Sequence, residues 1–233
     1  MNELPTLMPG EQTAPTRWLS LLSRYGLVVA PAWTSDAQLS SLLAEHECAF
    51  AQGSASVREV PYRPATASRA LRLTNSQAHE FPQIQAFLSH TTLKVVAAHY
   101  LGVSATVHQF AYLTRDVADP SPVTAIHYDR KHALKAYLCL TEARPGWGAP
   151  AFVPASHWRS RMIREKYLAA GVSPKDLPIT TGHEGNIPVP LEGPAGTLVV
   201  FDTDCLHQGG IVDPGNVRRV LRGHSHPLGS RFD

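Results

Sequence analysis

Two histidines and one aspartate stand at spacings that metal sites use. His127 and Asp129 are separated by one residue in the segment 123–129, whose alternating apolar and polar side chains predict a strand. Side chains two residues apart on a strand project from the same face, so the imidazole and the carboxylate would lie side by side. His207 follows the largely apolar run 196–206, at the far end of a second predicted strand. A core histidine bonded to a neighbouring acid is the alternative explanation of the His-x-Asp pair.

These three side chains, if they converge, define an open metal site. Two imidazoles and one carboxylate on one face of an ion leave three positions free, and non-haem Fe(II) oxygenases need those positions for a co-substrate and O₂. A structural zinc site would instead require four protein ligands, preferably cysteines, and the sequence contains no Cys-x-x-Cys pair. The pattern therefore predicts an Fe(II) site formed by His127, Asp129 and His207.

A basic segment begins eleven residues after His207 and could bind an anion. In residues 217–224 the period of a strand places Arg218 and Arg222 on the same face. A buried guanidinium needs an anionic partner, and it can hold a carboxylate through two parallel hydrogen bonds. The distal carboxylate of 2-oxoglutarate is such a partner. Arg218 is the first candidate for this clamp and Arg222 the second, and a solvated strand face would also explain either arginine.

The elements around these residues are expected to be mainly β after residue 102. Short apolar runs separated by Pro and Gly predict strands near 105–114, 123–129, 134–141, 150–153, 187–190, 197–202 and 217–224, with one helix over 156–171. Earlier in the chain, helices are predicted over 15–25, 35–53 and 82–100, with a short strand at 26–30. Many short strands behind a helical third favour an antiparallel barrel or jelly roll with helices packed outside.

Length and composition indicate one globular domain. The 233 residues, 43% of them hydrophobic, suffice for a real core. We expect a single domain over residues 1–233, made of a flexible lead (1–12), a mainly helical part (13–102) and a jelly-roll core (103–226).

The composition also excludes several classes of protein. Twenty-one basic and nineteen acidic residues give no electrostatic reason to expect a nucleic-acid or membrane-surface binder. No apolar run reaches the length of a membrane span, and the N-terminus does not resemble a secretory signal. Cys48, Cys139 and Cys205 are odd in number and far apart, so we expect no disulfide framework and a cytoplasmic location.

Four blocks, in this order, resemble the phytanoyl-CoA dioxygenase family of Fe(II)/2-oxoglutarate-dependent oxygenases. They are His127-Tyr-Asp129, the stretch from Tyr137 through Pro154-Ala-Ser-His157, the stretch from Gly196 to His207, and Arg218-Arg-Val-Leu. The resemblance spans nearly the whole chain and is most specific over 123–224. Two departures, Ala155 where glycine is usual and Thr197 where an acid is common, touch no ligand.

The resemblance implies a double-stranded β-helix, a cupin-like jelly roll, in which His127, Asp129 and His207 hold Fe(II). It further implies that Arg218 binds the distal carboxylate of 2-oxoglutarate and that Tyr137 contacts this co-substrate. Core packing would also explain Tyr137, which shares a strand face with Lys135 and Cys139. The implied reaction consumes O₂, converts 2-oxoglutarate to succinate and CO₂ and hydroxylates an unactivated C–H bond. Related halogenases lack the carboxylate, so Asp129 favours hydroxylation or desaturation.

The substrate residues are less specific. The candidates are Gln109 and Tyr112 before the His-x-Asp motif, Arg130 and His132 directly after it, and Arg222. Each of them could equally lie on a solvated surface.

We expect a small-molecule substrate, an amino acid or an intermediate of natural-product biosynthesis that carries an anionic group, and neither nucleic acid nor membrane as a partner. Two alternatives stay open. One is a non-catalytic metal-binding jelly-roll protein, which would have lost a ligand or the clamp. The other is a cupin-like metalloenzyme that does not use 2-oxoglutarate and would have no need of Arg218.

Overall fold

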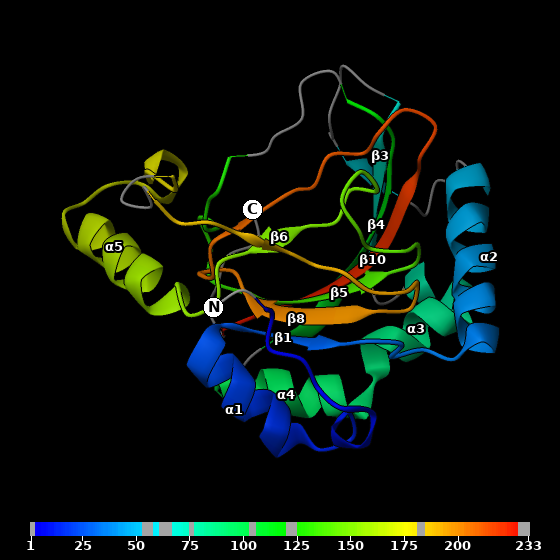
Figure 1. Ribbon diagram of the computed structural model, residues 1–233, viewed down its shortest axis with the longest axis horizontal. Helices are drawn as coiled ribbons and strands as arrows, with labels where there is room; N and C mark the ends of the chain where they lie inside the picture. Colours follow the sequence, from blue (N-terminus) through cyan, green and yellow to red (C-terminus); the bar gives the residue numbers. More distant parts are fainter. Residues whose placement is uncertain are drawn as a thin grey trace.

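A computed structural model describes residues 3–52, 58–60, 67–74, 77–102, 106–119, 125–180 and 185–227. Its strands form one seven-stranded and one three-stranded sheet, and helices flank the larger sheet (Figure 1). The predicted class, mainly β with flanking helices in a jelly-roll arrangement, is confirmed.

The larger sheet has the strand order β1-β8-β5-β10-β4-β3-β2, and all of its pairings are antiparallel. Its strands are β1 (Leu27–Ala30), β2 (Arg58–Val60), β3 (Arg69–Thr74), β4 (Thr106–Asp116), β5 (Leu134–Cys139), β8 (Leu198–Asp202) and β10 (Arg218–His226). The smaller sheet has the order β7-β6-β9, formed by β7 (Val189–Pro190), β6 (Ala151–Phe152) and β9 (His207–Gln208). The α-helices are α1 (Pro15–Tyr25), α2 (Asp36–Gln52), α3 (Pro82–Ser89), α4 (Thr91–Leu101) and α5 (His157–Ala169), and short 3-10 turns lie at Pro9–Glu11, Gln77–Glu80 and Pro174–Asp176.

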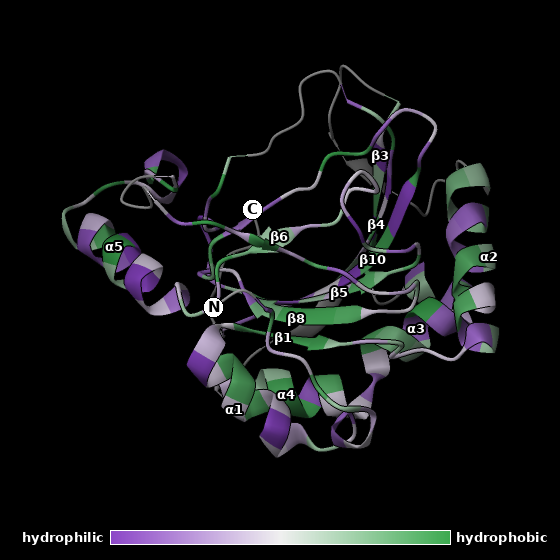
Figure 2. Ribbon diagram, in the orientation of Figure 1, coloured by the Kyte–Doolittle hydropathy of each residue, from purple (hydrophilic) through white to green (hydrophobic). Residues whose placement is uncertain are grey.

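The alternation of side chains gives the larger sheet two different faces. The outer face packs against α1, α3 and α4 in one apolar cluster that includes Val200 and Leu138 of the sheet and Trp18 of α1. The inner face packs against the smaller sheet, where the rings of Phe201 of β8 and Phe152 of β6 lie with their centroids 5.0 Å apart. Figure 2 shows β1 and β8 as hydrophobic and part of β10 as hydrophilic. Each fully buried large apolar side chain stabilises the fold by about 1.5–3 kcal/mol. The polar side chains on the inner face do not contribute in this way, so their presence there needs another explanation.

The N-terminal part contributes more to the sheet than the sequence predicts. The expected flexible lead is tied to β1, because the Leu7 amide donates to the Val29 carbonyl and the Val29 amide donates to the Pro5 carbonyl, both at 2.8 Å. Leu7 is buried. In addition, β2 and β3 form the sheet edge beside β4, inside the part expected to be mainly helical. Both strands are short. β3 pairs with the distant strand β4, and β2 pairs with β3, so the conformation of β3 depends on a contact that a local pattern does not reveal.

The helix predicted over 82–100 is interrupted. His90 has φ −58° and ψ 120°, outside helical geometry, and α3 ends and α4 begins around it. The apolar pattern continues across the break because both helices bury Leu88, Leu93 and similar side chains against the same sheet face. Periodicity alone therefore does not detect this break. In the described part of the chain, no helix combines the length and apolarity that a membrane crossing requires.

Acid sensitivity is the first expected consequence of this packing. His46 of α2 is fully buried, with Nε2 3.1 Å from the Thr114 carbonyl, and burial lowers its pKa from 6.5 to about 4. Between these two values the unfolded chain binds a proton that the folded chain does not. The free energy of unfolding should therefore fall as the pH drops through this window, by up to about 3 kcal/mol from this residue.

Urea unfolding at a series of pH values between about 7 and 4 measures this effect. In the His46→Gln variant, which keeps a polar group beside Thr114, the dependence on pH should be visibly shallower. An equally steep dependence in the variant would show that His46 is not the source.

Candidate metal centre

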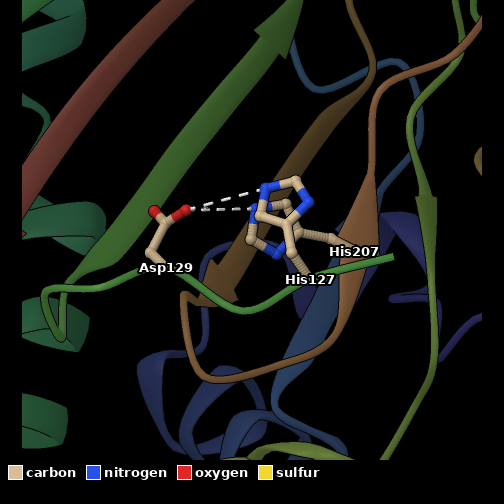
Figure 3. A group of neighbouring side chains, drawn as sticks. All are labelled: His127, Asp129 and His207. Carbon is tan, nitrogen blue, oxygen red and sulfur yellow. Dashed lines mark ion pairs between the residues drawn. The ribbon is translucent and has the colours of Figure 1, made fainter. Parts of the chain in front are cut away.

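His127, Asp129 and His207 come together between the two sheets (Figure 3). The two histidines form an antiparallel bridge, in which the His127 amide donates to the His207 carbonyl (3.0 Å) and the His207 amide donates to the His127 carbonyl (2.9 Å). The Asp129 amide donates to the Thr203 carbonyl at 2.9 Å. The strand predicted over 123–129 is wrong for the described residues 125–129, since only His127 pairs. His127 and Asp129 are therefore held by separate backbone hydrogen bonds to His207 and Thr203, and not by a continuous strand pairing.

The three side chains direct metal-binding atoms toward one point. Oδ1 of Asp129 lies 3.5 Å from Nε2 of His207 and 4.0 Å from Nε2 of His127. Nδ1 of each imidazole lies 2.8 Å from a backbone carbonyl two residues upstream, that of Ala125 for His127 and that of Cys205 for His207. A carbonyl only accepts hydrogen bonds, so each Nδ1 carries the proton and each Nε2 keeps its lone pair for a metal.

The charges in this group are those that a divalent ion requires. Oδ2 of Asp129 lies 2.5 Å from the Lys135 ammonium. Burial by itself would raise the pKa of the Asp129 carboxyl, but Lys135 and His207 hold that pKa well below its ordinary value. Burial, and then His207, lower the pKa of His127. At neutral pH the carboxylate is thus ionised and the His127 imidazole is neutral. Two imidazoles and one carboxylate fit Fe(II).

A cavity of about 290 Å³ opens beside the three ligands. Its wall combines apolar rings with cations and hydroxyls. Besides the ligands it is lined by Thr114, Lys135, Tyr137, Pro150, Phe152, Phe201, Gln208, Gly209, Arg218 and Arg222. The polar stretch of the inner sheet face is therefore the wall of this cavity.

Both residues predicted to bind a co-substrate lie in this wall. Arg218 is buried, and its Nε and Nη2 each lie 2.9 Å from Oδ2 of Asp116, while Nη1 donates to the Gly148 carbonyl. Tyr137 of β5 is also buried, and burial raises the pKa of its phenol. The structure thus brings Arg218 and Tyr137 into the same cavity as the ligands, with Arg218 already neutralised by a carboxylate on the neighbouring strand.

The five candidate substrate residues separate into different places. Arg222 lines the cavity, and Tyr112 pairs with it across β4 and β10. Arg130 is exposed. His132 does not line the cavity, and its Nε2 instead lies 3.3 Å from the Asp202 carboxylate. Gln109 stands on β4, and its side chain lies outside the described part of the structure.

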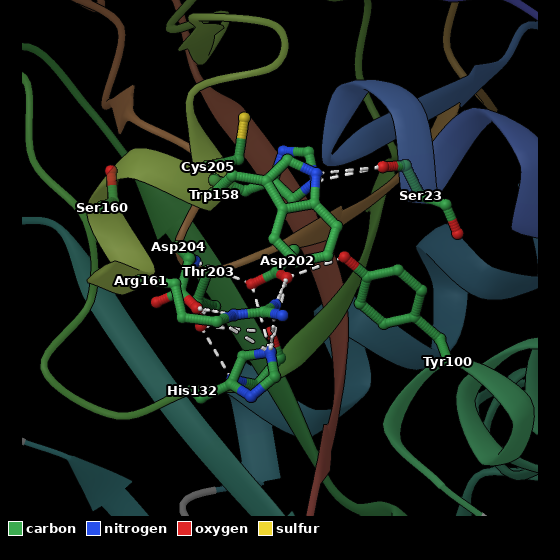
Figure 4. Close-up of polar contacts among 12 residues, drawn as sticks. Ser23, Tyr100, His132, Trp158, Ser160, Arg161, Asp202, Thr203, Asp204 and Cys205 are labelled. Atoms are coloured by element: carbon green, nitrogen blue, oxygen red, sulfur yellow. Dashed lines mark hydrogen bonds and ion pairs between the residues drawn. The ribbon is translucent and has the colours of Figure 1, made fainter. Parts of the chain in front are cut away.

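His132 belongs to a second cluster with Asp202 and Asp204 (Figure 4). Nη2 of Arg161 lies 2.6 Å from Oδ2 of Asp202, and Arg164 binds both oxygens of Asp204. Two arginines on α5 thus neutralise two buried aspartates, and no negative charge is left over for a metal ion. The cluster is a brace that fastens the turn before His207 to α5.

The sequence analysis missed this brace. Its only local signal is that Arg161 and Arg164 are three residues apart, which places both side chains on one face of a helix. Their partners lie some forty residues further on, and the connection depends on the tertiary fold.

A close backbone contact supports the Arg218 side of the cavity. A Cβ at Gly210 would overlap the carbonyl oxygen of Ala149 and the carbonyl carbon of Gly148, whose oxygen accepts from Arg218. Neither obstacle is the end of a flexible side chain. Gly210→Ala should therefore lower the free energy of unfolding by about 3 kcal/mol, measured by urea denaturation. Gly10→Ala is the control, because nothing lies within 4 Å of that position. Equal stability of the two variants would contradict the prediction.

Comparison with known proteins gives one family and a set of similar folds. The sequence matches the model of the phytanoyl-CoA dioxygenase (PhyH) family over residues 22–220. The structure is similar to the epimerase SnoN in complex with Fe3+, alpha ketoglutarate and nogalamycin RO, with a TM-score of 0.68 and 16% identity over 92% of this chain and 84% of that chain. The non-heme alpha ketoglutarate dependent carbocyclase SnoK from nogalamycin biosynthesis has a TM-score of 0.68 and 15% identity, covering 90% and 83% of the two chains.

AviO1 from Streptomyces viridochromogenes Tue57 is similar at a TM-score of 0.64 and 19% identity, over 94% of this chain and 97% of that chain. At such identities the structural likeness establishes the fold. A comparison with curated protein sequences found no match.

Proposed function

The chain belongs to the phytanoyl-CoA dioxygenase family of Fe(II)/2-oxoglutarate-dependent oxygenases, and we propose that it hydroxylates an unactivated C–H bond of a small molecule. The observation that carries this proposal is the donor set, two imidazole nitrogens and one carboxylate oxygen within 4.8 Å of one another beside a cavity. When bound, Fe(II), 2-oxoglutarate and O₂ would supply the oxidant, and 2-oxoglutarate would leave as succinate and CO₂.

The protein's part begins with holding the metal. His127 and His207 would bind through Nε2, because their Nδ1 atoms are committed to backbone carbonyls. Asp129 would bind through Oδ1, since Lys135 occupies the other oxygen. Lys135 would thereby keep the carboxylate from turning and from offering its second oxygen to the metal.

The co-substrate would lie along the inner face of the larger sheet. We assign the distal carboxylate of 2-oxoglutarate to Arg218, with Tyr137 as a further contact. Thr114, a buried residue that also lines the cavity, stands on the neighbouring strand. Phe152 and Phe201 form an apolar wall beside His207, with ring centroids 6.4 and 5.1 Å from the imidazole, and would keep water from the reacting centre.

The size of the cavity supports a small molecule as substrate. A volume of about 290 Å³ accommodates a co-substrate and part of a second small molecule. Two proteins of similar fold are named as an epimerase and a carbocyclase, one of them in complex with nogalamycin RO. The fold thus serves natural-product chemistry with more than one outcome, and we propose hydroxylation of an amino acid or natural-product intermediate.

One observation favours the cupin-like alternative that uses no keto acid. Asp116 already neutralises Arg218, so this arginine has a structural partner without any co-substrate. On this alternative, the Arg218–Asp116 pair only joins β4 to β10. The two functions differ in a single requirement, namely whether turnover consumes 2-oxoglutarate.

Succinate release and product mass test the proposal together. Protein loaded with Fe(II) is given 2-oxoglutarate, air and a panel of amino acids and natural-product intermediates. We expect succinate formation that requires Fe(II) and O₂, and a product heavier by one oxygen atom that comes from labelled O₂. An unsaturated or epimerised product would contradict hydroxylation, although succinate formation would still show that the enzyme uses 2-oxoglutarate. Metal-dependent oxidation without succinate would establish the cupin-like alternative.

A further inference from the structure

A row of alternating cations and aromatic rings crosses the inner sheet face beside the metal centre. Arg222 of β10 pairs with Tyr112 of β4, and Tyr112 pairs with Arg72 of β3. Cross-strand partners project from the same face, and Arg222 also pairs with the cavity residue Tyr137 of β5. The row therefore starts in the cavity wall and runs toward the sheet edge.

The position of Arg222 along β10 differs from that of Arg218. Lys135, which binds Asp129, is level with His224 of β10, and Tyr137 is level with Arg222. Arg222 is thus one pleat away from the level of Lys135, whereas Arg218 is three pleats away. A group that reaches Arg222 stays close to the metal ligands, and a group that reaches Arg218 extends away from them.

Arg222 has no anionic partner in the described part of the chain. Its Nε is buried there without a hydrogen bond, and its guanidinium carbon lies 5.6 Å from the centre of the Tyr112 ring. Arg72 is placed similarly, 4.0 Å from the centre of the Phe110 ring. Contact with an aromatic face compensates only part of the cost of withdrawing a cation from water. Arg222 could therefore bind an anion, and the described residues do not provide one.

The charges around the cavity indicate how much negative charge this anion should carry. Arg218 is neutralised by Asp116, and Lys135 by Asp129. A divalent metal ion and the two carboxylates of 2-oxoglutarate cancel each other. The charge of Arg222 is then left over, and a substrate with one negative charge would balance it.

We propose that Arg222 binds the carboxylate of a monoanionic substrate, next to the metal centre and facing Tyr112. The proposal rests on the proposed function, since it takes the metal ion and 2-oxoglutarate as already bound. Arg222 determines specificity on this view, because an uncharged analogue would leave the guanidinium without a partner. Arg72, one strand beyond Tyr112, strengthens the positive potential at the same end of the row.

Binding of matched acids and amides tests the proposal without turnover. The protein is loaded with Zn(II) and 2-oxoglutarate, and ligand-observed NMR measures the affinity of phenylacetate against phenylacetamide and of N-acetyl-leucine against its amide. We expect each carboxylate to bind at least about tenfold more tightly than its amide, as one partly buried ion pair provides. Arg222→Met should abolish the difference and Arg222→Lys should restore part of it.

Arg219→Met is the matched control. It removes the same charge from the same strand, but on the outer face, where Arg219 binds Glu47. The preference for carboxylates should persist in this variant. Equal binding of acids and amides to the wild-type protein would overturn the proposal, and so would a preference that survives Arg222→Met.

The experiment also identifies the source of the carboxylate. The affinity for 2-oxoglutarate is measured separately in each variant, and Arg222→Met should leave it within about twofold. If that affinity collapses and the preference for acids remains, Arg222 serves the co-substrate and the proposal fails. If the wild-type protein binds no 2-oxoglutarate at all, the proposed function fails, whatever Arg222 does.

Discussion

Replacing Asp129 by alanine should lower the rate of succinate formation by at least about a thousandfold. The carboxylate is the one anionic ligand of the proposed site, and its loss removes several kcal/mol of metal binding and transition-state stabilisation. The two imidazoles remain, each fixed by a carbonyl at 2.8 Å, so weak metal binding should persist. Succinate per protein and iron retained after gel filtration measure the two effects separately.

The matched control is an exposed histidine on the opposite side of the larger sheet. His99 of α4 is exposed and lies outside both histidine clusters. His99→Ala should therefore retain wild-type iron content and succinate formation. Turnover by Asp129→Ala within tenfold of the wild type would show that the carboxylate is not a required ligand and would overturn the three-ligand site.

Replacing Arg218 by methionine should raise the KM for 2-oxoglutarate by about a hundredfold, with a smaller change in kcat. A charged hydrogen-bonded pair is worth about 1.5–3 kcal/mol, and this interaction is made with bound co-substrate before any chemistry occurs. Steady-state kinetics with 2-oxoglutarate as the varied substrate give both constants. An unchanged KM would show that Arg218 does not bind 2-oxoglutarate.

The Arg218→Met variant also leaves Asp116 buried without this partner, so a control for structural damage is needed. 2-Oxopentanoate has the same chain length as 2-oxoglutarate and lacks the distal carboxylate. Its KM should be the same in the variant and in the wild type, because nothing in it contacts Arg218. A similar rise for both keto acids would assign Arg218 to the joint between β4 and β10.

The types and spacing of the ligand residues make the metal centre accessible to sequence analysis. Few side chains bind iron, and the sequence contains a single His-x-Asp motif, His127 and Asp129. The choice of His207 among the later histidines rests on its place at the end of an apolar predicted strand and on the family resemblance. The backbone contacts that hold these residues in place could not be predicted from the sequence. The segment 125–129 alternates as a strand does, yet its conformation depends on single backbone contacts with 203 and 207.

The surroundings of the site depend on strand register, which the sequence does not specify. Arg218 and Asp116 are 102 residues apart, and they meet only because β10 pairs with β4 in one particular register. Lys135 could be placed on the face of Tyr137 by period two, but its reach to Asp129 follows from the position of the loop. The same holds for β3, whose strand conformation comes from its neighbour β4. Long-range pairing, and not local propensity, decides these features.

The most direct test of the account is an anaerobic titration of the metal-free protein with Fe(II) and then 2-oxoglutarate. A keto acid that chelates iron beside three protein ligands gives a weak visible charge-transfer band. The account predicts that this band appears in the wild-type protein at one equivalent of each component and is absent from His207→Ala. Iron binding without the band would contradict the use of 2-oxoglutarate, and absence of iron binding would contradict the metal centre itself.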